Sequence, residues 1–276
     1  MPRSILRPLI QTRACHATRR LIGGTSKLLQ WLSPPRCLLC KENHDRPHAI
    51  CANCEGLLPR NSRACCRCGL ALGTAVPAGA RQIEPSEHCG ACRRGPPRFQ
   101  HTLAPFLMQA GMQELIHLWK FQGQSHLTSL LAVLFTSAIA PRTVRQIPRS
   151  AVLVPIPTQW HRQIVRGFDH TWLLAQALRW HLPGDNKINP WLRNTGFLKP
   201  QHRLDRRDRM KRGRDRFSAH PNATGEHIIL IDDVMTTGAT ARSAAAAFAA
   251  VGAQSITVWC IARTPAPEDK RTDTLR

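Results

Sequence analysis

The stretch at residues 228–240 constrains the fold more than any other part of the sequence. It begins with an apolar run from Ile228 to Ile231 and continues with Asp232 and Asp233. A short loop of hydroxyls and one glycine follows, and then an alanine-rich segment. This order predicts a buried strand, a polar loop and a helix N-terminus, where backbone N–H groups and the helix dipole attract an anion. Gly238 lets the backbone approach the anion closely, and the threonine hydroxyls add donors. The stretch therefore predicts an α/β fold with a site for a phosphorylated ligand.

The two adjacent carboxylates need a different role, because they would repel a phosphate. Accepting hydrogen bonds from two vicinal ribose hydroxyls suits them. The stretch resembles the 5-phosphoribosyl-1-pyrophosphate (PRPP) binding motif of type I phosphoribosyltransferases, in which an apolar strand and two acids precede a Thr-Thr-Gly-x-Thr loop. An ordinary strand–loop–helix turn with incidental acids is the alternative. The resemblance implies that PRPP is bound by Asp232, Asp233, Val234, Met235, Thr236, Thr237, Gly238, Ala239 and Thr240.

Strand-like and helix-like segments alternate through the second half of the chain. Hydrophobic patterns predict strands near residues 103–106, 152–157 and 255–261, and helices near residues 111–121, 125–140, 170–181 and 240–251. Residues 183–194 have the composition of a connector. Such alternation predicts a parallel sheet with flanking helices and with ligand sites at the C-terminal ends of the strands.

Cysteines dominate the region before this sheet. Eight of the 11 cysteines form four C-x-x-C pairs, in a region too poor in apolar runs to fold by core packing alone. Two such pairs complete a tetrahedral Zn²⁺ site, so four pairs predict two structural zinc ions. Disulfides are the alternative, but the chain shows no secretory signal. Pairing in chain order closes the shortest loops and is favoured, while crossed pairing and a ligand role for Cys66 stay open. The predicted ligands are Cys37, Cys40, Cys51, Cys54, Cys65, Cys68, Cys89 and Cys92.

The charge of the chain is unusual, with a formal net value of +22 and a pI near 11.1. Such a field favours polyanions, which include nucleic acid, phosphorylated metabolites and an anionic membrane surface. No apolar run approaches the ~18 residues of a membrane span. Residues 1–36 hold seven Lys or Arg and no acid, which predicts a poorly ordered basic leader, with a transit peptide as the alternative. We therefore expect a cytoplasmic protein.

Several arginines are candidates for phosphate contacts. Residues 199–216 hold nine Lys or Arg against three acids, which predicts a mobile lid over an anionic ligand or a nucleic-acid contact, with a merely solvated face as the alternative. The pyrophosphate and lid candidates are Arg162, Arg166, Arg203, Arg206 and Arg209. A second group accompanies the cysteine pairs and offers backbone contacts to nucleic acid: Arg60, Arg63, Arg67, Arg93, Arg94 and Arg98.

Together these motifs resemble the ComF family of bacterial competence proteins over about residues 35–264. The cysteine pairs, Trp119-Lys-Phe-Gln-Gly123, Val154-Pro-Ile-Pro157, Arg166-Gly-Phe168, Gln201 and the Asp-Asp-x-x-Thr-Thr-Gly loop recur there in this order. The family usually has Asn where this chain has Asp169.

The resemblance implies a type I phosphoribosyltransferase-like parallel sheet with flanking helices, preceded by a small double zinc-ribbon domain. The expected organisation is a leader at 1–36, the ribbon at 37–95, the phosphoribosyltransferase-like domain at 103–264 and a polar tail at 265–276. It also implies a part in natural transformation or DNA utilisation, with PRPP and Mg²⁺ as ligands. Incoming single-stranded DNA and other competence or DNA-processing proteins are the implied partners. The alternative is an active phosphoribosyltransferase of a nucleobase-type small molecule, with no direct DNA role.

Overall fold

The computed structural model describes residues 35–73, 87–139, 143, 146–158, 168–182, 184–195 and 216–266. Contacts divide the chain into two compact units, Met1–Cys51 and Ala52–Arg276. The five pyrophosphate and lid arginines and nearly all of the basic leader lie outside the described residues. The predicted domain boundaries stay predictions. No helix in the described part of the chain has the length and apolar character needed to cross a membrane.

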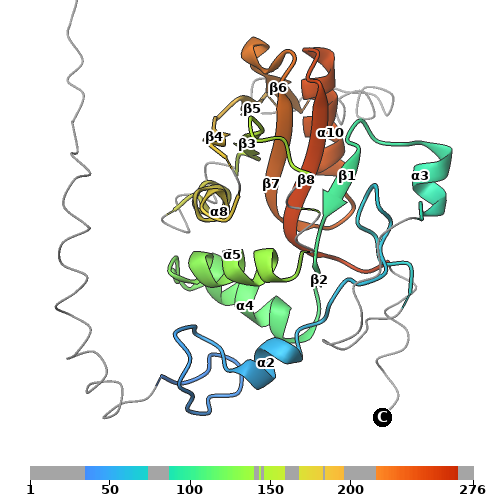
Figure 1. Ribbon diagram of the computed structural model, residues 1–276. Coiled ribbons are helices and arrows are strands. Elements are labelled where there is room, and N and C mark those ends of the chain that lie inside the picture. The colour runs from blue at the N-terminus through green and yellow to red at the C-terminus, as the bar shows by residue number, and fades with distance from the viewer. Residues whose placement is uncertain are drawn as a thin grey trace, which may run out of the picture. The chain divides into compact units, whose positions relative to one another are not determined.

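A six-stranded sheet forms the framework of the unit Ala52–Arg276 (Figure 1). Its strands run in the order β1-β8-β7-β3-β4, β2 also pairs with β8, and every pairing is parallel. The strands are β1 (His101–Leu103), β2 (Phe106–Leu107), β3 (Val152–Pro155), β4 (Lys187–Ile188), β7 (His227–Met235) and β8 (Ser255–Arg263). The predicted parallel α/β sheet is confirmed.

Two details of the predicted strands are wrong. The single strand expected at 103–106 is two strands, because Pro105 between them has no N–H to donate to a ladder. Its carbonyl instead accepts from the backbone N–H of Asn61 at 2.9 Å. The connector expected at 183–194 contains β4 and β5 (Leu192–Asn194), and β5 pairs antiparallel with β6 (Phe217–Ala219).

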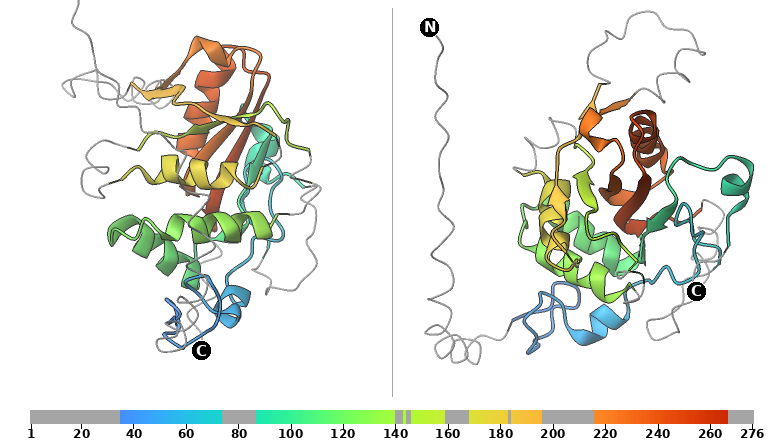
Figure 2. Two further views of the ribbon diagram at one scale, coloured as in Figure 1. Left: turned by 60° about the vertical axis from the view of Figure 1, so that its left-hand side comes forward. Right: turned by 45° about the horizontal axis from the view of Figure 1, so that its top comes forward.

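Helices cover both faces of the sheet (Figures 1 and 2). On one face, α8 (His170–Arg179) contacts β3 and β7, and α5 (Leu127–Ser137) packs Phe135 against Trp259 of β8 with ring centroids 5.3 Å apart. The helix α4 (Ala110–Phe121) contacts α5 on this side. The opposite face carries α10 (Ala239–Ala250), which contacts β6, β7 and β8. Three short helices complete the described elements: α2 (Ala52–Gly56), α3 (Gly90–Arg94) and η2 (Pro221–Ala223).

The start of α8 explains the acid at position 169. The Asp169 carboxylate accepts from the backbone N–H groups of Thr171 and Trp172, both at 3.2 Å, and from the Thr171 hydroxyl at 2.8 Å. This is an N-cap, which satisfies helix donors that have no partner within the helix. An asparagine oxygen accepts the same bonds, so the departure from the family's usual residue keeps the helix start intact.

Candidate functional site

The loop after β7 forms a helix N-terminus suited to an anion. Thr236 and Thr237 are exposed, and Gly238 occupies the N-cap position of the 12-residue helix α10 with φ 77°. That conformation disfavours any residue with a side chain, and a Cβ at Gly238 would lie 3.4 Å from the Met235 Sδ. The backbone amides at the start of α10 therefore lie beside exposed hydroxyls.

The two acids lie inside β7 and not after it. The sequence placed them beyond the apolar run, but β7 continues to Met235 because it keeps pairing with β8, with Asp232 opposite Cys260 and Met235 opposite Arg263. The acids are therefore held on a rigid strand at the edge of the loop.

Asp233 is held by a lysine and a histidine. Its Oδ2 lies 2.5 Å from the Lys120 Nζ of α4 and 2.5 Å from the His170 Nε2 of α8. Burial raises the pKa of Asp233, but His170 and Lys120 outweigh burial and hold this pKa well below its usual range. Its Oδ1 also accepts from the Val234 N–H at 2.5 Å. Asp233 is therefore ionised at neutral pH.

Asp232 has the opposite electrostatic character. Burial, followed by the negative charge of Asp233, raises the pKa of Asp232 to about 7. Its Oδ1 accepts from the backbone N–H of Asp233 at 2.9 Å, which opposes the rise. The acidic pair therefore changes its net charge close to neutral pH.

Sequence reasoning missed the two partners of Asp233. Lys120 lies 113 positions before Asp233 and His170 lies 63 before it, so no local pattern joins them. The available signal was the motif at residues 119–123. Buried Trp119 donates from its Nε1 to the Thr128 hydroxyl at 2.9 Å and meets the His170 ring edge-on at 5.3 Å. Trp119 thus positions both the helix that carries Lys120 and the His170 ring.

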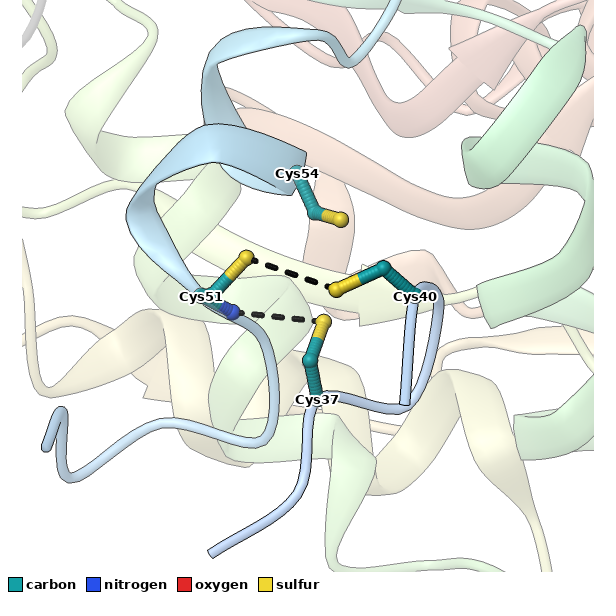
Figure 3. Close-up of side chains that lie close together, drawn as sticks. All are labelled: Cys37, Cys40, Cys51 and Cys54. Atoms are coloured by element: carbon teal, nitrogen blue, oxygen red, sulfur yellow. Dashed lines mark hydrogen bonds between the residues drawn. The ribbon is translucent and has the colours of Figure 1, made fainter. Parts of the chain in front are cut away.

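The eight predicted thiol ligands form two groups, in chain order. In each group the sulfur atoms lie within 4.8 Å of one another. The first set consists of Cys37, Cys40, Cys51 and Cys54, which Figure 3 shows converging from a turn and from the start of α2. The second set consists of Cys65, Cys68, Cys89 and Cys92. The grouping follows the pairing that closes the shortest loops.

Both sets suit a tetrahedral metal. The Cys40 and Cys51 sulfurs are 3.8 Å apart and the Cys68 and Cys89 sulfurs are 3.6 Å apart. Zinc–sulfur bonds in a tetrahedral site place the sulfurs about 3.8 Å apart. The two sets therefore have the donors and the spacing for two structural zinc ions.

One thiol of each set has a lowered pKa, which favours its ionised form. Burial raises the pKa of Cys37, but hydrogen bonds from the backbone of Cys40 and Cys51 outweigh it and lower the pKa to about 6. The Cys65 thiol has the same arrangement and a pKa lowered to about 7. Cys66 stays outside the second set, with its Sγ 3.5 Å from the His88 Nε2. Backbone donors that favour thiolates at these positions support metal binding.

The arginines near the cysteine pairs divide into engaged and exposed groups. Arg60 lies over the Phe106 ring at 4.7 Å, and Arg67 donates to the Pro97 carbonyl at 3.4 Å. Arg63 pairs with Glu87 at 3.4 Å. The remaining three of these six arginines, Arg93, Arg94 and Arg98, are all exposed.

Comparison with known families and proteins agrees with this geometry. Residues 28–94 match the double zinc ribbon domain, and residues 194–275 match the phosphoribosyl transferase domain. The DNA utilization protein YhgH of Escherichia coli K12 is 31% identical over 237 residues, which cover 84% of this chain and 98% of that protein. Competence protein F of Haemophilus influenzae is 28% identical, covering 83% of this chain and 96% of its own length. Competence protein ComFC of Bacillus subtilis is 26% identical, covering 81% of this chain and 89% of its own length.

The likeness to the DNA utilization and competence proteins spans nearly the whole of these relatives and joins the cysteine sets to the sheet in one chain. The chain therefore belongs to the ComF family, with a double zinc ribbon and a phosphoribosyltransferase domain.

Proposed function

We propose that this protein binds PRPP at the loop between β7 and α10 and acts with incoming single-stranded DNA in the cytoplasm. The observation that carries the PRPP proposal is the junction itself, where β7 with its two acids leads through exposed threonines and a left-handed glycine into the N-terminus of α10. The backbone amides of residues 235–239 would hold the 5-phosphate. The carboxylates of Asp232 and Asp233 would accept hydrogen bonds from the ribose hydroxyls.

The contacts of Asp233 support its role as an acceptor. An ionised carboxylate only accepts hydrogen bonds, and Lys120 and His170 keep Asp233 ionised. Mg²⁺ would be carried mainly by the pyrophosphate and ribose oxygens of the ligand, since this ion retains water and binds substrate phosphates.

Titration calorimetry with PRPP and Mg²⁺ tests this site. We expect the wild type to bind and the double variant Asp232→Ala/Asp233→Ala to lose at least about tenfold in affinity, since each lost hydrogen bond to a charged group contributes about 1.5–3 kcal/mol. Asp185→Ala is the control, because that carboxylate is exposed and pairs with Arg179 at 3.2 Å. Wild-type protein that fails to bind PRPP would refute the site.

The DNA proposal rests on charge and on the relatives. The net charge of +22 favours polyanions, and the relatives are named for DNA utilization and competence. Arg93, Arg94 and Arg98, close to Cys92, are exposed and offer contacts to a DNA backbone. Contacts of this kind give binding that depends on salt and not on sequence.

Fluorescence anisotropy with labelled single-stranded DNA tests the charge argument. We expect binding at ~50 mM salt, with log K falling ~0.7 per neutralised phosphate as log salt rises. The triple variant Arg93→Ala/Arg94→Ala/Arg98→Ala should weaken binding and flatten this slope. The matched control, Arg149→Ala/Arg179→Ala/Arg193→Ala, removes the same charge from exposed positions elsewhere. Equal effects of the two variants would rule out a contact at residues 93–98.

A second candidate is transfer of the phosphoribosyl group to a nucleobase-type small molecule without a DNA role. The phosphoribosyl transferase domain match and the acidic pair favour it. Pyrophosphate release from PRPP on addition of free nucleobases, with no DNA binding at ~50 mM salt, would select this candidate.

A further inference from the structure

Arg263 ends β8 as a buried arginine, with 5% of its surface exposed. Its Nε donates to the Cys68 carbonyl at 3.2 Å. Its Nη1 donates to the Met235 carbonyl at 2.8 Å, and the Thr236 carbonyl is a further acceptor of the same nitrogen. One guanidinium group therefore joins a cysteine of the second set to the last residue of β7 and to Thr236, which begins the loop between β7 and α10, called the phosphate loop below.

The turn that carries Cys65 and Cys68 is held by hydrogen bonds from β1, from β8 and from Asn61. The four consecutive carbonyls of residues 66–69 all accept hydrogen bonds from residues outside the turn. The first two accept from the N–H and the hydroxyl of Thr102, at 3.3 and 2.7 Å. The third accepts from Arg263, and the fourth accepts from the Asn61 amide at 2.8 Å. The turn is therefore fixed to β1 and β8 by its backbone.

The side chains continue this attachment. The four thiols of the second set belong to the same buried cluster as Met235 before the loop and Ala241 after it. The Cys68 and Cys92 thiols are buried, so the side chains that pack around the metal site also pack against the sheet. Because these side chains are closely packed, the core that supports the loop resists movement of the second set. Any movement that does occur is passed on to the loop through that core.

We propose that Arg263 is a positioning residue that fixes the phosphate loop to the second cysteine set, so that metal bound there raises the affinity of the loop for phosphoribosyl ligands. This inference rests on the proposed function for its ligand. With the carbonyls of Met235 and Thr236 held by Arg263, the loop backbone is ordered before the ligand arrives. Ligand binding then requires less ordering, which increases affinity.

The test compares full-length wild type with Arg263→Lys. A lysine keeps the positive charge but lacks the planar fork that reaches both the Cys68 carbonyl and the loop carbonyls. We expect the PRPP affinity to fall about tenfold, as for loss of a hydrogen bond to a charged group. Arg193→Lys is the matched control, because Arg193 is an exposed residue of β5. Zinc content should be the same in all three proteins.

Hydrogen–deuterium exchange without ligand separates this inference from the proposed function. Amides of residues 235–242 should exchange about tenfold faster in Arg263→Lys than in wild type, because that local opening becomes easier by a similar factor. If wild type does not bind PRPP but the exchange difference is present, the ligand proposal fails and the positioning role stands. Unchanged exchange and unchanged PRPP affinity in Arg263→Lys would overturn the inference.

A second variant guards against misfolding of Arg263→Lys. Asn61→Ala removes the donor to the Gly69 carbonyl and leaves Arg263 in place. We expect a smaller rise in loop exchange, about threefold, because the turn is loosened one residue from the Arg263 contact. No change in loop exchange in this variant would also count against the link.

Discussion

The two cysteine sets share one backbone geometry in different surroundings. The residue after the second cysteine has a positive φ in both, 66° at Lys41 and 67° at Gly69. Its N–H donates to the carbonyl of the first cysteine at 2.9 Å in the first set and 2.8 Å in the second. The N–H of the third cysteine donates to the sulfur of the first cysteine, at 3.4 and 3.3 Å. A five-residue helix then follows, α2 in one case and α3 in the other.

What surrounds these equal turns differs. In the first set Cys40 is exposed, and hydrogen bonds within residues 35–51 shape the turn. In the second set all four thiols are buried, and donors from Asn61, Thr102 and Arg263 attach the turn to the sheet. The same motif is therefore held by local contacts in the first set and by contacts with β1 and β8 in the second.

The largest expected contrast comes from removing one ligand at the equivalent position of each set. Cys65→Ser should lower the free energy of unfolding of the sheet unit by on the order of 5 kcal/mol, since a structural metal contributes directly to folding. Cys37→Ser should leave unchanged the urea concentration at which the sheet in the unit Ala52–Arg276 is half unfolded. Urea unfolding followed by fluorescence of the buried Trp119 and Trp259 measures both. Equal losses in the two variants would remove the contrast between the sets.

A methyl group added to the second turn should have the next largest effect. Gly69→Ala places a Cβ 3.0 Å from the Thr102 Cγ2 at a φ of +67°. We expect the free energy of unfolding to fall by about 2–3 kcal/mol, because the left-handed conformation and the crowding both destabilise the folded state. Gly123→Ala is the control, because it has φ +65° with nothing within 4 Å and so isolates the backbone cost. If both variants lose the same free energy of unfolding in urea, the added methyl group at residue 69 is not crowded by Thr102 of β1.

The pH dependence of PRPP binding should distinguish the loop from both cysteine sets. The pKa of Asp232 is raised to about 7, so the acceptor carboxylate forms as pH rises through that value. PRPP affinity should therefore increase about tenfold from pH 6 to pH 8, as the ionised fraction of such a group does. Calorimetry at both pH values checks this, and Asp232→Asn should leave only the titration of the ligand itself. If Asp232→Asn keeps the same pH dependence of PRPP affinity, a group other than Asp232 causes that dependence.

The smallest change that we expect is an increase in the stability of the first cysteine set. Lys41→Gly relieves a side chain from the left-handed region and should stabilise the first turn by about 0.5–1 kcal/mol, net of glycine's larger entropy loss. Zinc release from the first set should slow by a factor of about three, matching that free energy. Faster release would mean that the Lys41 Nζ contact to the Leu38 carbonyl, at 2.6 Å, stabilises the turn more than the strain costs.

Local patterns predicted the elements that carry the site. The run from Ile228 to Ile231 gave β7, and the alanines after Gly238 gave α10, because both segments are long and bury a face that the sequence displays. The strands β4, β5 and β6 have two or three residues each, which is too short for any periodicity. The pairing of β5 with β6 joins Leu192 to Ala219, and nothing near either residue indicates it.

The site was predictable only where its residues are neighbours in the chain. The acids, the threonines and Gly238 form one motif, whereas Lys120 and His170 reach Asp233 from two other helices. Arg263 reads as an ordinary strand end, and only the fold brings it against Cys68 and Met235. Charge partners of this kind are set by topology, which local sequence does not specify.

The rate of zinc release from the wild-type protein, with and without PRPP and Mg²⁺, tests whether the second cysteine set and the phosphate loop are coupled. Coupling between two sites is reciprocal, so if the second cysteine set supports the phosphate loop, ligand on the loop must retain metal in the second set. A chromogenic chelator should reveal two release phases, one for each set, and the phase lost in Cys40→Ser identifies the first set. We expect PRPP to slow release from the second set by at least about fivefold and to leave release from the first set unchanged. Equal slowing of both phases, or no slowing in a protein shown to bind PRPP, would contradict a coupling between the second cysteine set and the phosphate loop.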